Sequence, residues 1–233
     1  MKIAQLYNRY PDSEVYIVGT GPSLRTFPTR ILRNKITIGL NQAYRHLSTT
    51  YSITVHPELV EEYMQAGADT FPTRWIAKHK APVYYKLDHP DYFVFHTVHD
   101  FGIVHNPVPD TLFLGHGVQQ TAMHMAYLLG AKVIYLVGVD MCDLGGDHHG
   151  HEQHVRFHCL PSTDVYREYY EWTSRMRREL REHGVDVVNL TSFLGAKNAE
   201  LEYEGLCQEY SLKPLAPPRD TSGYYRQAIE LPP

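Results

Sequence analysis

The sequence has few cysteines and no long hydrophobic run. Its three cysteines, Cys142, Cys159 and Cys207, are odd in number and form no CxxC pair, so we expect reduced thiols rather than a disulfide framework. The longest apolar run covers residues 133–139, far short of the roughly 20 residues that a transmembrane helix needs. Residues 1–5 lack the apolar core of a signal peptide. These absences predict a cytoplasmic protein without a transmembrane segment.

The chain also lacks a large excess of charge of either sign. Its formal net charge is −4, which gives no broad electrostatic reason to bind nucleic acid or an anionic membrane. With 233 residues, 43% of them hydrophobic and 21% charged, the chain has the composition and length of one sizeable globular domain. Histidine and tyrosine are abundant, with 15 and 18 residues.

Apolar runs and turn residues alternate along the chain. The runs predict buried strands at residues 14–18, 36–40, 51–55, 132–139 and 185–190. Helices are expected at residues 59–66, 118–129 and about 164–183, and short β-like runs that we do not order lie between 75 and 104. This alternation predicts an α/β fold with a Rossmann-like, doubly wound, mostly parallel sheet in a single domain, residues 1–204. A proline-rich C-terminal arm, residues 205–233, is expected to wrap the domain or a partner subunit of a homo-oligomer.

The two later helices differ in pattern. Small and apolar residues predict a buried helix that ends at Gly130. The last helix is amphipathic and is closed by Gly184. Its apolar positions are Val165, Tyr169, Trp172, Met176 and Leu180, and its other side carries Arg175, Arg177, Arg178 and Arg181. We interpret the arginines as a solvated face rather than a phosphate site.

A glycine-rich turn follows the first strand. It reads Gly19-Thr20-Gly21-Pro22-Ser23. Leu24 replaces the third glycine of a dinucleotide fingerprint, neutral Asn41 stands where an acidic ribose ligand is expected, and no GxxxxGK[ST] loop is present. The sequence therefore excludes NAD-dependent and P-loop sites, and leaves a different nucleotide site or a purely structural tight turn.

Ligands of doubly wound sheets bind at the carboxyl ends of the strands, where the strand order reverses. The glycine turn follows the first strand, and Asn41-Gln42, His56 and Asp140 follow later strands. This placement favours a nucleotide site.

The same positions resemble a known family. The segment 15–24 with Asn41-Gln42 resembles the opening of the bacterial family 42 sialyltransferases, where a strand leads into Gly-Asn-Gly-Pro-Ser-Leu and later Asn-Gln. Residues 55–59, Gly117-Val118 with the helix after it, and the strand 134–140 resemble their later elements. The related motility-accessory-factor and 6-hydroxymethylpterin pyrophosphokinase-like families share this skeleton.

The resemblance implies a Rossmann-like domain of the GT-A-like variety that binds a CMP-type nucleotide-sugar donor. It implies a glycan or other hydroxyl acceptor and no required metal. The implied nucleotide-binding positions are Gly19, Thr20, Gly21, Pro22, Ser23, Asn41, Gln42, His56, His116, Gly117, Asp140 and Cys142. A histidine before the last long helix is the family's general base, and the matching residue here is His158, or His154 if the alignment slips.

Several matched positions depart from the family pattern. Thr20 and His56 replace asparagines, and His116 replaces the serine before Gly-Val. Cys142 and His148 stand where two tyrosines stabilise the departing phosphate. Histidine donates well to a phosphate oxygen, whereas cysteine donates poorly. We therefore expect His148 to assist phosphate departure.

Acidic and histidine residues are concentrated between positions 140 and 158. They are Asp140, Asp143, Asp147, His148, His149, His151, His154 and His158. His154 and His158 have the spacing of zinc ligands on a helix, Asp140 and Asp143 suit Mg²⁺ on a diphosphate, and a metal-free polar loop is the third interpretation. Two rivals to sugar transfer remain at this point: an ATP- and Mg²⁺-dependent pyrophosphokinase and a non-catalytic nucleotide-binding module.

Overall fold

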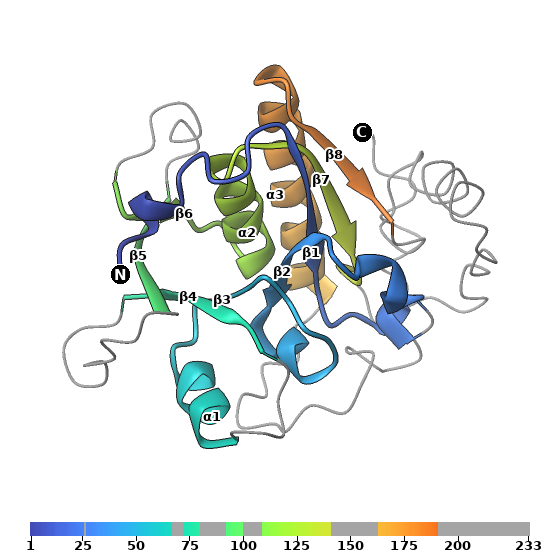
Figure 1. Cartoon of the computed structure of the whole chain (residues 1–233). Coiled ribbons are helices and arrows are strands. Elements are labelled where there is room, and N and C mark those ends of the chain that lie inside the picture. Colours follow the sequence, from blue (N-terminus) through green and yellow to red (C-terminus); the bar gives the residue numbers. More distant parts are fainter. Residues whose placement is uncertain (26, 67–71, 80–91, 100–108, 141–162, 191–233) are drawn as a thin grey trace.

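One sheet organises the protein. The computed structural model describes residues 1–25, 27–66, 72–79, 92–99, 109–140 and 163–190. Within them, eight parallel strands form a sheet in the order β6-β5-β4-β3-β2-β1-β7-β8 (Figure 1). The strands are β1 (Ser13–Val18), β2 (Ile36–Leu40), β3 (Tyr51–Thr54), β4 (Arg74–Lys78), β5 (Tyr92–Val98), β6 (Thr111–Phe113), β7 (Ala131–Val137) and β8 (Asp186–Asn189).

In the part of the chain that the structure describes, three α-helices and four short 3₁₀ segments accompany the strands. The α-helices are α1 (Glu58–Ala66), α2 (Val118–Leu128) and α3 (Thr163–Glu182), and the 3₁₀ segments are η1 (Ile3–Leu6), η2 (Pro22–Arg25), η3 (Thr29–Leu32) and η4 (Asn41–Arg45). Among the described residues no helix is long and apolar enough to cross a membrane.

The strand order reverses at β1. This strand pairs with β2 on one side and with β7 on the other, so the chain builds outward to β6 and then returns to the opposite side. The predicted doubly wound sheet is confirmed, and within the described residues every strand pairing is parallel.

Both faces of the sheet are buried, which explains the continuous apolar runs of its central strands. Val15 and Ile17 of β1 belong to the core cluster that includes residues of α2 and α3. The alternate residues Tyr16 and Val18 pack with Leu24 and other residues of the opposite face. A third cluster joins Trp75 of β4 to residues of η4 and α1. Since successive strand residues face opposite layers, each layer takes every second residue.

Glycines end the later helices as predicted. Gly130 after α2 and Gly184 after α3 have φ angles of +96° and +76°, a left-handed conformation that other residues adopt at a cost. The strand expected at 132–139 ends earlier, at Val137, because Gly138 turns the chain with a φ of +62°.

The arginine side of α3 agrees with the prediction at three of its four positions. Arg175, Arg178 and Arg181 are exposed. Arg177 instead donates from Nε and one terminal nitrogen to the Val187 carbonyl oxygen of β8, at 3.2 and 2.8 Å. The 140–158 loop beyond Asp140 and the expected arm at 205–233 lie outside the described residues.

Candidate functional site

The predicted site residues gather at one edge of the sheet. Because all the strands are parallel, their carboxyl ends share that edge. The glycine turn follows β1, and Asn41 follows β2. His56 follows β3, His116 lies between β6 and α2, and Asp140 follows β7. The glycine turn and Asp140 therefore flank the point of reversal between β1 and β7.

The glycine turn lies directly against the end of β7. The Gly19 and Gly21 amides donate to the carbonyl oxygens of Val137 and Gly138, at 2.7 and 2.8 Å. A Cβ on Gly21 would lie 2.7 Å from the Gly138 oxygen and would also collide with the Asp140 carboxylate. Close approach of two loops is thus one physical reason for glycine at this position.

Asp140 and Ser23 form a buried link across the reversal. Asp140 is 3% exposed and Ser23 is 4% exposed. One carboxylate oxygen accepts the Ser23 backbone amide at 2.6 Å, and the other accepts the Ser23 hydroxyl at 2.5 Å. Hydrogen bonds to a carboxylate are among the stronger ones in proteins. The amide groups of Gly19, Gly21 and Ser23 are all engaged within the protein, so this turn differs from a loop whose free amides cradle a phosphate.

The ends of β2 and β3 are joined in a similar way. Asn41 has a φ of +47°, and its side-chain oxygen accepts the Thr54 hydroxyl at 3.0 Å. The Thr54 oxygen in turn accepts the His56 amide at 2.9 Å. Gln42 is buried and His56 is exposed. The Asn41 and His56 loops are therefore held in fixed relative positions at the carboxyl edge.

The first turn of α2 opens toward the same edge. The Gly117 amide donates to the Gln120 side-chain oxygen at 2.8 Å, which caps the helix. The Gln120 side-chain nitrogen donates to the Thr173 hydroxyl of α3 at 3.0 Å. Gln119 is 6% exposed, and its Nε2 makes no hydrogen bond in the described structure. A helix N-terminus presents backbone amides and a partial positive charge to an anion.

His116 is paired with a carboxylate from α3. Its Nδ1 lies 2.8 Å from Oε2 of Glu168, and the two side chains are 42% and 49% exposed. The imidazole also lies against Trp172, with ring centroids 5.3 Å apart. Glu168 and Trp172 were not predicted as site residues. Only the contact of α3 with His116 reveals them, because their sequence pattern is that of an ordinary helix.

The structure brings together some of the predicted residues and leaves others untested. It places Gly19, Thr20, Gly21, Ser23, Asn41, Gln42, His56, His116, Gly117 and Asp140 at the carboxyl edge. Pro22 opens η2 beside them. Cys142, His148, His154 and His158 lie outside the described residues. Among the residues that are described, no three histidine, cysteine or acidic side chains come together as metal ligands.

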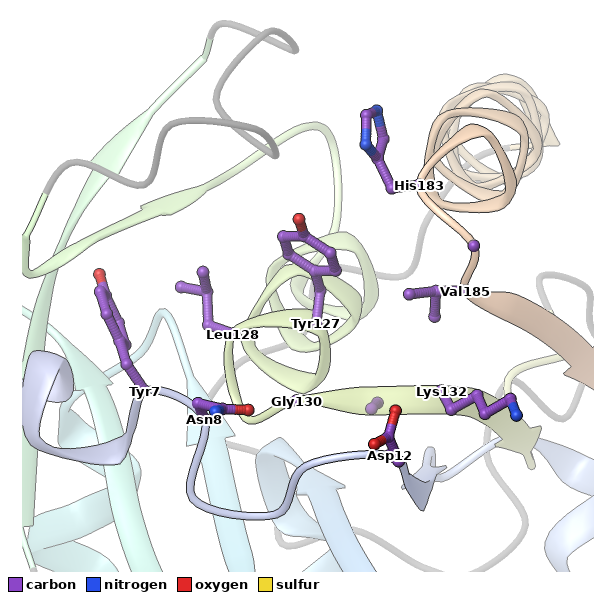
Figure 2. A pocket seen from close by; sticks show the side chains of 11 residues that line it. Tyr7, Asn8, Asp12, Tyr127, Leu128, Gly130, Lys132, His183 and Val185 are labelled. Carbon is purple, nitrogen blue, oxygen red and sulfur yellow. The ribbon is translucent and has the colours of Figure 1, made fainter.

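A hollow of about 450 Å³ lies at the opposite edge (Figure 2). It is bordered by the ends of α2 and α3 and by the loop before β1. Its lining residues are Tyr7, Asn8, Asp12, Tyr127, Leu128, Gly130, Ala131, Lys132, His183, Gly184 and Val185. Since β1 and β7 begin at this edge and end at the other, the hollow is separate from the predicted site.

Comparisons with known proteins give one kind of likeness. No protein-family model matches the chain, and no curated protein matches it. A solved structure of the sialyltransferase CstII from Campylobacter jejuni with cytidine-5'-monophosphate is 16% identical, with a TM-score of 0.42 over 78% of this chain and 81% of that chain. A structure of the same enzyme with CMP-3FNeuAc is 12% identical, with a TM-score of 0.40 over 77% and 81%. The likeness is one of fold.

Proposed function

We propose that the protein is a sialyltransferase-like glycosyltransferase that transfers a sugar from a CMP-type nucleotide donor to an acceptor hydroxyl. The observation that best supports this function is the buried link between Ser23 and Asp140. It joins two segments of the family resemblance that are 117 positions apart in the sequence. Contact between two segments so far apart in the sequence is what a single shared site would require.

The geometry suggests how the site divides its tasks. The glycine turn, Asn41 and His56 would border the nucleoside, with Asp140 and Ser23 fixing the floor between β1 and β7. The departing phosphate would lie toward the first turn of α2, where backbone amides offer donors. Donors of this kind stabilise a leaving phosphate without a metal ion. His148 would assist that departure, as the resemblance implies.

The same geometry offers less to an ATP-dependent pyrophosphokinase. That chemistry needs a divalent ion to neutralise a transferring diphosphate. Asp140 is the implied ligand within the described residues, and both of its oxygens already accept hydrogen bonds from Ser23. Sugar transfer is therefore the better-supported reaction.

A ligand screen tests the proposal. The melting temperature of the protein would be measured with CMP, CDP, UDP and ATP, each with EDTA and with Mg²⁺. We expect CMP and CDP to stabilise the fold in EDTA, because a ligand at about 100 times its Kd adds about 2.7 kcal/mol. Asp140→Asn should weaken that stabilisation, whereas the exposed Asp186→Asn at the opposite edge should leave it unchanged.

Turnover would then be measured as CMP release from CMP-N-acetylneuraminic acid and other CMP-sugars. Stabilisation by ATP only with Mg²⁺ would overturn the proposal in favour of diphosphate transfer. Binding of CMP without release from any CMP-sugar would instead identify a non-catalytic module.

A further inference from the structure

The pair formed by His116 and Glu168 has the geometry of an oriented acid–base group. His116 is held by the short segment between β6 and α2, and Glu168 projects from α3. The contact is made by the Nδ1 atom of the imidazole, at 2.8 Å from the carboxylate. A ring nitrogen that faces a carboxylate carries the proton, and this fixes the tautomer of the histidine.

The other ring nitrogen is then the basic one. With the proton on Nδ1, Nε2 carries a lone pair. Nδ1 is the ring nitrogen that contacts the carboxylate, and the His116 side chain is 42% exposed. The imidazole therefore presents an accepting nitrogen to solvent at the carboxyl edge, where the proposed substrates would bind.

The surroundings of the pair keep the ring in place. Trp172 packs against the imidazole on one side, and Phe113 stacks on Trp172 with ring centroids 5.8 Å apart. Gln120 ties the first turn of α2 to Thr173, which directly follows Trp172 on α3 and lies five residues beyond Glu168. A base that is fixed by two side chains of α3, Glu168 and Trp172, meets the positional requirement for proton transfer.

We propose that His116 is the general base of the transfer reaction, with Glu168 as its positioning residue. This inference rests on the proposed function, and it assigns to His116 the role that the family resemblance gives to His158. In this arrangement the carboxylate binds one ring nitrogen of the histidine and thereby orients the other nitrogen, which takes the proton.

The transfer step moves one proton to the protein and exchanges one bond at the anomeric carbon. Nε2 of His116 takes the proton of the acceptor hydroxyl while the acceptor oxygen forms a bond to the anomeric carbon. The bond between that carbon and the phosphate oxygen breaks, and its electron pair leaves with the nucleoside monophosphate. The imidazolium that results is stabilised by the Glu168 carboxylate.

A first experiment tests the pair without any substrate. Long-range ¹H–¹⁵N correlation spectra of ¹⁵N-labelled protein report which ring nitrogen carries the proton. We expect the Nδ1–H form for neutral His116 in the wild type, its loss in Glu168→Ala, and its retention in Glu168→Gln, because the amide oxygen still accepts the bond. An Nε2–H form of His116 in the wild type would overturn the proposal.

A second experiment measures release of CMP from the CMP-sugar that the wild type uses. His116→Gln should lower kcat by about 10²-fold or more with a small change in KM. Glu168→Ala should lower kcat on the order of tenfold, with partial rescue in Glu168→Gln. His183→Gln, an exposed histidine at the opposite edge, is the control and should keep wild-type turnover.

The outcomes separate this inference from the function on which it rests. If no CMP-sugar is turned over by the wild type, the proposed function fails, whereas the tautomer measurement still reports on the pair. If the wild type is active and His116→Gln keeps its full kcat while His158→Gln loses it, the base is the one that the resemblance implies and our assignment is wrong.

Discussion

At the scale of single residues, Gly21 and Gly184 allow two reasons for a glycine to be compared, close steric contact and a left-handed backbone. Gly21 does not have a left-handed φ, but a Cβ there would meet the Gly138 oxygen and the Asp140 carboxylate. Gly184 has a φ of +76° and open space around it. Gly21→Ala should therefore be costly for steric reasons, by about 2–4 kcal/mol. Gly184→Ala should cost only the strain of a left-handed alanine, about 1 kcal/mol.

Urea unfolding measures both costs, and CMP stabilisation reports on the site. Gly21→Ala should also abolish the effect of CMP, because it separates the glycine turn from the end of β7. Gly184→Ala should keep the effect of CMP in full. Equal stability losses in the two variants would contradict the steric argument.

At the scale of elements, Gln120 connects α2 to α3. Its oxygen accepts the Gly117 amide, and its nitrogen donates to the Thr173 hydroxyl and to the Tyr169 carbonyl oxygen, the last at 3.3 Å. Gln120→Leu would remove the acceptor of the Gly117 amide and the donor to the buried Thr173 hydroxyl. Since an unsatisfied buried polar group costs about 1–3 kcal/mol, we expect a loss of stability in that range, measured by urea unfolding.

The control for this helix contact is Gln65→Leu on α1, where the side chain is exposed. It should change the stability by less than about 0.5 kcal/mol. A Gln120→Leu variant as stable as this control would show that the contact between α2 and α3 does not depend on the glutamine.

The elements themselves were mostly predictable from sequence. Strands buried on both faces read as continuous apolar runs, and Gly130 and Gly184 ended their helices as expected. The sequence does not predict β6, because a strand of three residues is too short to show an alternating pattern of apolar and polar residues. The position of the glycine turn was predictable, since it depends on strand order. The pairing of His116 with Glu168 was not, because it depends on how α3 packs beside the segment before α2, and periodicity does not encode that contact.

At the scale of the whole molecule, a buried histidine predicts sensitivity to acid. His124 in α2 is fully buried, and its Nδ1 accepts the Phe113 amide at 2.9 Å. Desolvation by burial lowers the pKa of His124 from 6.5 to about 4. The unfolded chain therefore binds a proton that the folded protein excludes between these values. The stability that His124 contributes is complete above pH 6.5 and falls as the pH decreases toward 4, by about 3 kcal/mol in total.

His124→Asn tests this dependence, because the asparagine oxygen can accept the Phe113 amide and does not titrate. Urea unfolding at pH 7.5 and pH 4.5 should show a decrease in stability that is smaller in the variant than in the wild type, by about 2–3 kcal/mol. His183→Asn is the control at an exposed position and should follow the wild type. An identical decrease in His124→Asn would assign the acid sensitivity to other groups.

The pairing of β1 with β7 has a consequence for synthesis of the chain. Residues Val15–Val18 pair with Ile134–Val137, which leave the ribosome long after them. Until then, one side of an apolar strand has no neighbour, and unpaired strand edges promote association between chains. Nascent chains should therefore depend on chaperones from the completion of β1 until β7 has emerged. A ribosome-bound chain that stops before residue 131 should be captured by them more strongly than one that extends beyond residue 190.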